Sequence, residues 1–236
     1  MKKMWGIDDG GFTLVELLIV IALIAVLSVA VLATINPIEQ SNKARDAKVQ
    51  NDAAEVLNAY ERYYTSTTHY PWMDVVGGSA LTVDSAYQGR SIQVGFGLCS
   101  HGLPLAPTTG CESQTLAGRL IETQELKDSF LTKTYTRLSD GSDPAYNYHD
   151  ELYVYKQPAT QGNSIYVCYV PKARANRIPP ATSSWKLKAL AFAGGSENAA
   201  LPTAFVDATP EQITAATYDT LLGLGGNATL FRCVPE

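Results

Sequence analysis

The chain is poor in the residues that carry most enzyme chemistry. Of its 236 residues, only three are histidines and four are cysteines. His69, His101 and His149 lie far apart, and no nucleophile-elbow, HExxH or phosphate-binding-loop pattern accompanies them. A turn containing Asp140 and Asp143 could hold calcium, but its spacing does not match an EF-hand, and we interpret it as a solvated turn. We therefore expect no catalytic residue, no cofactor and no metal site.

The chain also lacks an excess of positive charge. It carries 18 Lys and Arg residues against 23 Asp and Glu residues, for a formal net charge of -5. The charges are not clustered, so a broad basic face for nucleic acid is not indicated. The length suits one globular domain with an appendage, or two small domains.

The four cysteines lack CxxC spacing, and an even number of such cysteines indicates two disulfides in an oxidising compartment. The alternative is four reduced thiols in a cytosolic protein. Four cysteines allow three pairings, and we favour Cys99 with Cys111 and Cys168 with Cys233. The first bond would close a short loop, for about 3 kcal/mol, and the second would tie the C-terminus to a sheet, for about 4 kcal/mol.

One long segment is almost free of charge. From Phe12 to Ile35 there are 24 consecutive residues with a single charge, Glu16, and nothing later in the chain is comparable. A helix of that length spans about 36 Å, which exceeds the roughly 30 Å of a bilayer core. The segment is therefore a membrane-spanning helix or the apolar part of a signal peptide.

The position of Glu16 distinguishes between these interpretations. A carboxylate this far inside a membrane segment costs about 2.5 to 3.5 kcal/mol on insertion, so it needs a partner. Cleavage between Gly11 and Phe12 would supply one, because the new α-amino group would lie four residues before Glu16 on the same helical face. The glycine has no side chain and so leaves room for a protease to approach the backbone.

The string from Gly11 to Glu16, followed by the unbroken apolar run, resembles the class III signal of type IV pilins and pseudopilins. The resemblance covers about residues 10–36, and the rest of the chain is similar to the family only in layout. It implies that a prepilin peptidase cuts after Gly11 and N-methylates Phe12. It also implies that Glu16 guides the docking of each incoming subunit onto a growing filament.

Two other interpretations of the N-terminus remain open. An ordinary secretory signal would be cut after Ala30, but Glu16 fits poorly inside the core of such a signal. An uncut signal-anchor helix is the second. The charged side chains of residues 1–11 sum to zero, so the positive-inside bias is weak. Orientation therefore rests on the resemblance and on the cysteines.

The apolar run is followed by a proline and then by an amphipathic pattern. Pro37 predicts a kink or local unwinding over residues 33–37. Apolar residues then recur at three- and four-residue steps up to Tyr64, with charged residues between them, which indicates a helix. The expected organisation is a cleaved leader over 1–11, a transmembrane or filament-core helix over 12–36, an amphipathic continuation over 37–65 and an extracytoplasmic head over 66–236.

The head is predicted to be mostly strand and loop. Residues 66–90 read as a loop, and residues 119–131 as a short helix. Strands are expected at 91–99, 151–156 and 164–170, with weaker candidates at 186–192 and 228–234. The predicted fold is α+β and pilin-like, with a long kinked N-terminal helix packed on an antiparallel sheet and held by disulfides.

The resemblance implies a structural protein and not an enzyme. The expected function is that of a type IV pilus (fimbrium) subunit, for adhesion, twitching motility or DNA uptake. The implied partners are further copies of the chain in a helical filament, the prepilin peptidase, and an inner-membrane assembly platform with an ATPase motor. The chain would be a single-pass membrane protein before assembly and part of an extracellular filament afterwards. The alternatives are a pseudopilin of a type II secretion or competence system, and a minor pilin whose head is an adhesin or DNA-binding module.

Overall fold

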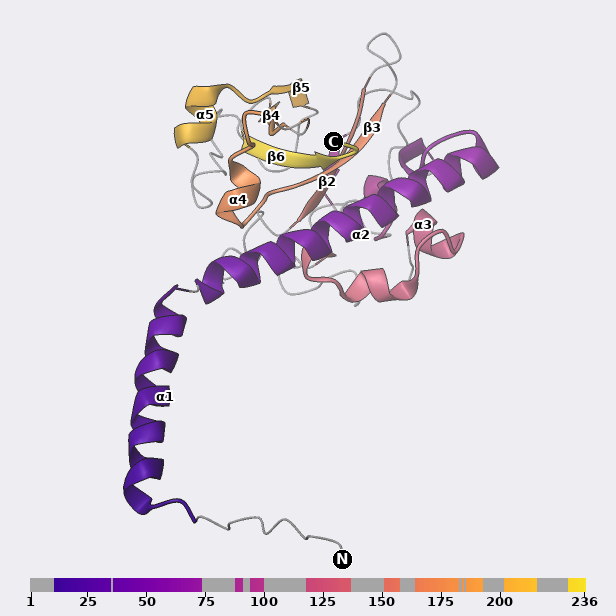
Figure 1. The fold of residues 1–236 in the computed structure, drawn as a ribbon. Coiled ribbons are helices and arrows are strands. Elements are labelled where there is room, and N and C mark those ends of the chain that lie inside the picture. Colours follow the sequence, from indigo (N-terminus) through magenta and orange to yellow (C-terminus); the bar gives the residue numbers. More distant parts are fainter. Residues whose placement is uncertain are drawn as a thin grey trace, which may run out of the picture. The chain divides into compact units, whose positions relative to one another are not determined.

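The computed structural model describes residues 11–34, 36–73, 88–90, 94–99, 118–136, 151–157, 164–182, 184, 186–192, 202–215 and 229–236. The chain divides into two compact units, Met1–Ser41 and Asn42–Glu236, and each is described by itself. The first contains the helix α1 (Leu14–Thr34) and the first turn of α2 (Pro37–Thr67). The second contains the rest of α2 and all the strands (Figure 1).

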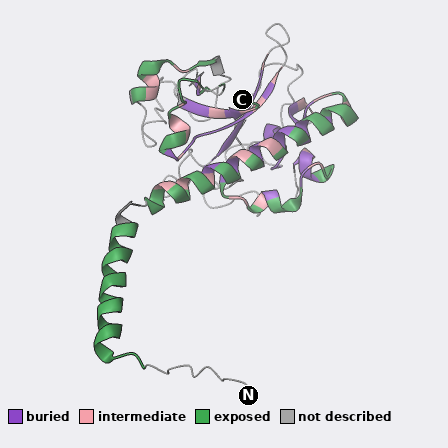
Figure 2. Ribbon diagram, viewed as in Figure 1, coloured by how far each residue is buried: buried purple, intermediate pink, exposed green. Residues whose placement is uncertain are grey.

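Helix α1 is apolar on all sides. Its 21 residues include no glycine or proline and one charge, Glu16, in the first turn. Residues 14–31 are all exposed, and this part of α1 is green in Figure 2. The hydroxyl of Ser28 donates to the carbonyl oxygen of Ile24 at 2.7 Å, so this polar group is satisfied inside the helix. The backbone of helix α1 thus forms its hydrogen bonds within the helix, and the apolar side-chain surface of the helix is exposed.

Helix α2 has its own start signal. The side-chain oxygen of Asn36 accepts a hydrogen bond from the backbone N–H of Glu39 at 3.2 Å, which makes Asn36 the N-cap. Pro37 follows at the first helical position, where its missing N–H costs nothing. Helix α1 ends at Thr34 and α2 begins at Pro37, and residue 35 between them lies outside the described residues.

The far end of α2 is set by a run of hydroxyl residues. Thr65 and Thr67 donate their hydroxyls to the carbonyl oxygens four residues earlier, at 2.8 and 2.7 Å. Thr68 then adopts a positive φ of 66°, a left-handed conformation that ends helices. Between its ends the helix buries one stripe at three- and four-residue spacing, and its members are Val49, Ala53, Val56, Leu57, Tyr60 and Tyr63.

The strands form one antiparallel sheet in the order β1-β2-β3-β6-β4-β5. Their bounds are β1 Gln88–Arg90, β2 Leu152–Lys156, β3 Ile165–Tyr169, β4 Lys188–Phe192, β5 Pro202–Asp207 and β6 Thr229–Val234. The C-terminal strand β6 is inserted between β3 and β4, so the end of the chain lies in the middle of the sheet. In Figure 1 α2 runs along the β2–β3 part of this sheet.

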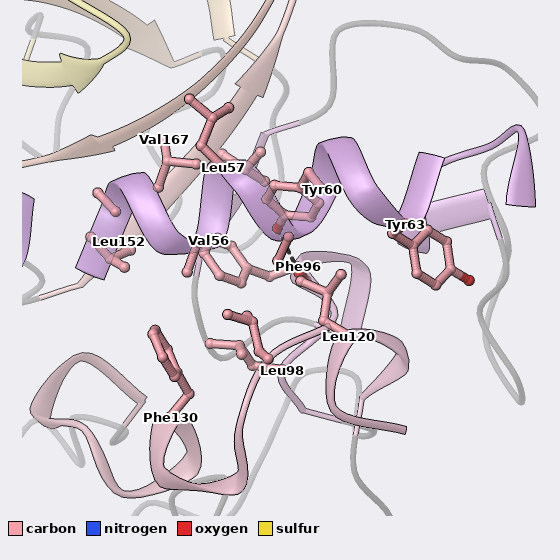
Figure 3. Close-up of a cluster of buried hydrophobic side chains, with 14 of the residues drawn as sticks. Val56, Leu57, Tyr60, Tyr63, Phe96, Leu98, Leu120, Phe130, Leu152 and Val167 are labelled. Carbon is pink, nitrogen blue, oxygen red and sulfur yellow. Dashed lines mark hydrogen bonds between the residues drawn. The ribbon is translucent and has the colours of Figure 1, made fainter. Parts of the chain in front are cut away.

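Two hydrophobic clusters bury both faces of the central strands. Leu152 and Val154 of β2 belong to the larger cluster, which contains the stripe of α2, whereas Tyr153 between them belongs to the smaller one. Figure 3 shows the larger cluster, with labels on Val56, Leu57, Tyr60, Tyr63, Phe96, Leu98, Leu120, Phe130, Leu152 and Val167. The second unit therefore has a layered core: α2 lies on one face of the sheet, and a second apolar layer lies on the other.

The strand predicted over residues 91–99 is wrong in its described part. Residues 94–96 form a short 3₁₀ turn, η2 (Val94–Phe96), and residues 91–93 lie outside the described residues. Gly97 follows with a φ of 90°, a backbone conformation that ends any extended run there. The phenol of Tyr60 donates to the carbonyl oxygen of Phe96 at 2.5 Å and fixes the turn against α2. The apolar residues are buried as expected, but by a turn and not by a strand.

The helix predicted over residues 119–131 is divided. Helix α3 covers Arg119–Glu122 only, Gln124 has a positive φ of 61°, and a 3₁₀ segment, η4 (Asp128–Thr132), follows. The four other predicted strand regions contain β2, β3, β4 and β6. Among the described residues, the elements that were not predicted are β1, β5, α4 (Arg174–Arg177), α5 (Pro210–Ala215), η1 (Pro71–Met73) and η5 (Thr134–Thr136).

Candidate processing and assembly site

The candidate site begins at the exposed end of α1. Among the described residues, α1 is the one helix that is long and apolar enough to cross a membrane, with a mean hydropathy of 3.0 over Leu14–Val31. None of that window is buried. Burial of apolar surface is worth about 25 cal/mol per Å², so this helix is strongly favoured inside lipid or against other apolar helices. The apolar helix fits membrane anchoring.

Thr13 and Glu16 form a reciprocal capping box at the start of this helix. The backbone N–H of Thr13 donates to Oε2 of Glu16 at 2.9 Å, and the hydroxyl of Thr13 donates to the same oxygen at 2.8 Å. In return, the backbone N–H of Glu16 donates to Oγ1 of Thr13 at 3.3 Å. This is the arrangement of an S/T-x-x-E motif, with Thr13 at the N-cap and Glu16 at the third helical position.

Gly11 and Phe12 lie outside the helix, directly before the capping box. The side chain of Phe12 is 83% exposed. A Cβ atom added to Gly11 would meet nothing within 4 Å, so nothing in the described chain itself requires glycine there.

One predicted disulfide lies fully inside the described residues. Cys168 of β3 and Cys233 of β6 are directly opposite in the sheet, and their sulfur atoms are bonded. The bond joins residues 65 positions apart and fastens the C-terminal strand to the centre of the sheet. Cys99 is also disulfide-bonded. Cys111, the partner expected for it, lies outside the described residues.

A buried polar network was missed at the sequence level. Asp46 of α2 is fully buried, and its carboxylate accepts the backbone N–H groups of Lys172 and Ala173 at 2.9 and 2.8 Å. It also accepts a bond from the side-chain amide of Asn176 at 3.0 Å and pairs with Arg45 at 3.1 Å. Four donors thus satisfy one charge, as a buried carboxylate requires.

The network continues to the C-terminus. Asn176 accepts a hydrogen bond from Arg232 of β6 at 3.0 Å, and Arg232 in turn donates to the side chain of Glu236 at 3.0 Å. Gln50 of α2 donates to the same carboxylate oxygen at 3.0 Å. The start of α2 in the head is therefore held by the segment after β3 and by the last residues of the chain. The sequence did contain one signal of this network, because Asp46 lies at the helical spacing of the buried stripe of α2.

The candidate metal-ligating side chains do not come together in the part of the chain that the structure describes. The described residues contain no group of three or more His, Cys, Asp or Glu side chains placed to hold a metal ion. His69 packs its ring edge-on against Tyr63, whereas His101, His149 and the Asp140–Asp143 turn lie outside the described residues. An open depression of about 490 Å³ on α2 is lined by Asn58, Glu61, Arg62, Thr65 and Ser66.

Comparison with known proteins bears on the N-terminus alone. Residues 8–32 match the family model described as the prokaryotic N-terminal methylation motif. No curated protein and no solved structure matches the chain. The matched segment contains Gly11, Phe12 and the capping box, and it is joined to an α+β head with an antiparallel sheet and a disulfide. Residues 8–32 therefore carry a motif that matches the class III signal peptide of type IV pilins, and the fold of the described residues is consistent with an α+β pilin-like fold.

Proposed function

We propose that this protein is a structural subunit of a type IV pilus, processed after Gly11 and polymerised through α1 into a surface filament. One observation carries the proposal. An apolar helix with residues 14 to 31 all exposed carries a carboxylate, Glu16, in its first turn, inside a methylation motif. The apolar surface of such a helix must be buried in lipid or against other apolar helices. The core of a filament supplies such helices. The proposed role is assembly and involves no catalysis by this chain.

The proposed processing step creates a positive charge that can pair with the carboxylate of Glu16. Hydrolysis breaks the C–N bond between Gly11 and Phe12. The oxygen of water goes to the carbonyl carbon of Gly11, which becomes a carboxylate, and its two protons go to the nitrogen of Phe12, which becomes an ammonium group. A prepilin peptidase is the proposed enzyme. It would then transfer a methyl group from a sulfonium donor to the nitrogen of Phe12, which first gives up a proton, and the donor would leave as a thioether. The ammonium would lie four residues before Glu16 in the chain and just outside the helix, where it can pair with the carboxylate of its own chain or of a neighbour.

The proposed partners follow from this role. Before assembly the chain is a single-pass membrane protein, with its head on the extracytoplasmic side, where disulfides such as Cys168–Cys233 persist. An inner-membrane platform with an ATPase motor moves subunits out of the bilayer into an extracellular filament of identical chains. The filament serves adhesion, twitching motility or DNA uptake.

The proposal is tested on filaments sheared from the cell surface, by intact mass and N-terminal analysis of the dominant subunit. We expect this chain, beginning at a methylated Phe12. If it begins at Phe12 in membranes but is absent from the filaments, the protein is a pseudopilin or a scarce minor pilin, and the proposed major-subunit role is overturned. A chain that begins at Met1 or at Val31 overturns the processing step as well.

A further inference from the structure

Both donors of Thr13 converge on a single oxygen of Glu16. The backbone N–H and the hydroxyl reach Oε2 at 2.9 and 2.8 Å, and Oε1 has no partner among the described residues. An ionised carboxylate has about four acceptor positions, so half of its capacity remains unused. We infer that Thr13 is a positioning residue of the proposed processing and assembly site. It holds Oε2 of Glu16 within its own chain, so that Oε1 is directed to an incoming ammonium group.

The capping box also determines where the helix begins. The first four N–H groups of a helix have no partner inside it, and those of α1 are partly satisfied by this box. Thr13 is therefore the N-cap, and Leu14 is the first helical residue. Gly11 and Phe12 are left outside the helix, with the bond between them available in a non-helical conformation. Without the hydroxyl of Thr13, one bond to Glu16 and the return bond from its N–H are both lost.

The box also lowers the cost of placing Glu16 in lipid before processing. A polar group without a hydrogen bond in an apolar medium is strongly disfavoured, and two donors from Thr13 satisfy half of this carboxylate. The ammonium group formed at Phe12 then meets a carboxylate that is already oriented. Thr13 thus acts through Glu16, and it need not contact the incoming subunit. This inference rests on the proposed function, because it concerns the same processing and docking steps.

The test compares three variants of the full-length chain in cells that process the wild type. Thr13→Val keeps the shape and the backbone N–H but removes the hydroxyl. Thr13→Ser restores the hydroxyl. Ser28→Ala is the matched control, because it removes another hydroxyl of α1 that bonds only to Ile24, away from the box. The rate of cleavage after Gly11 is followed by intact mass, and incorporation is measured as the share of processed chains in sheared filaments.

We expect Thr13→Val to slow processing or to lower incorporation by about five- to tenfold, the effect of losing one helix cap. Thr13→Ser and Ser28→Ala should behave as the wild type does. Normal processing and incorporation of Thr13→Val would overturn the inference and leave the proposed function intact. Equal losses in Thr13→Ser and Thr13→Val would also overturn it, because the hydroxyl would then be irrelevant. A wild-type chain that is never cut after Gly11 overturns the proposed function itself.

A second measurement detects the box without depending on processing. Hydrogen exchange on the full chain in detergent micelles should show protection of the Thr13 amide in the wild type. Glu16→Ala should remove that protection. Fast exchange of the Thr13 amide in the wild type would overturn the inference.

Discussion

The buried carboxylate of Asp46 in α2 accepts the backbone N–H of Ala173, 127 residues further along the chain, at 2.8 Å. This bond ties the first buried turn of the long helix to the segment that leaves the centre of the sheet. Lys172 and Asn176 bond to the same carboxylate, so the loss of Asp46 would leave the buried N–H of Ala173 and two half-buried donors without this acceptor.

Asp46→Ala should lower the free energy of unfolding by about 3 kcal/mol, because the donors to a buried charged group lose their acceptor. The measurement is a denaturant titration of the full chain in mild detergent, followed by near-ultraviolet circular dichroism. Asp128→Ala is the control, because Asp128 is exposed in the first turn of η4. A transition midpoint of Asp46→Ala equal to that of Asp128→Ala would contradict the assigned role of this network.

The Cys168–Cys233 bond should contribute about 4 kcal/mol to the free energy of unfolding, since it closes a loop across 65 positions. The double variant Cys168→Ala, Cys233→Ala removes it without reducing the second disulfide, which contains Cys99. The expected result is a lower denaturant midpoint, with the C-terminal strand β6 the first to lose amide protection. Equal midpoints for the variant and the wild type would show that the sheet register alone holds β6 in place.

Two buried tyrosines make the head sensitive to alkali. Burial raises the pKa of Tyr135 and of Tyr169 well above the usual value. The carboxylates of Asp52 and Glu55 add to the rise in the pKa of Tyr135, whereas Arg232 partly offsets that of Tyr169. The folded chain therefore keeps both phenols protonated, while the unfolded chain ionises them above about pH 10. The contribution of the two phenols to the free energy of unfolding is fully present below that pH. It is lost as the pH rises further, by about 1.4 kcal/mol per pH unit for each tyrosine.

Tyr135→Phe should therefore reduce the steepness with which stability falls above about pH 10, measured as denaturant midpoints across the alkaline range. Tyr169→Phe should do the same and should also leave stability at neutral pH unchanged or higher by about 1 kcal/mol. Its hydroxyl is buried and has no hydrogen-bond partner among the described residues, so removing it leaves no donor unsatisfied. Tyr64→Phe is the control at a side chain that is 40% exposed. An unchanged alkaline slope in both buried variants would refute this explanation.

Substitutions of Glu16 can distinguish its role in capping α1 from the role of its negative charge in docking. Glutamine also serves at the third helical position of a capping box, so Glu16→Gln should be processed after Gly11 as the wild type is. It cannot pair with an ammonium group, and its incorporation into filaments should fall by tenfold or more, about 1.4 kcal/mol. Glu16→Ala should lose both properties. Glu39→Ala, in the first turn of α2, is the control. Filaments of normal yield from Glu16→Gln would mean that the charge has no part in docking.

The parts of the fold that could be predicted are those set by residues close together in the chain. The helix α1, the break before Pro37 and the apolar runs of β2 and β3 follow from local composition. The sequence also contains both capping motifs, Thr13 with Glu16 before α1 and Asn36 with Glu39 before α2. The helices were predicted, but the capping motifs were not.

The parts that could not be predicted depend on distant contacts. The alternation across residues 91–99 is that of a strand, but Gly97 at a positive φ and the bond from Tyr60 to Phe96 produce a turn. Both faces of β2 and β3 are buried, so the simple in-and-out pattern of a half-buried sheet does not apply to them. The partners of Asp46 come from a segment whose position no local pattern fixes.

The separate start of α2 at Asn36 and Pro37 has a consequence for how such a chain can change in evolution. In one continuous helix, each residue added to the membrane segment would rotate everything after it by about 100°. Because α1 ends at Thr34 and α2 is capped anew, a change in the length of α1 need not turn the buried stripe of α2 away from its sheet. In the proposed membrane-anchored state, the length of the apolar segment can then adapt to a thicker or thinner bilayer, while the packing of the head is inherited unchanged.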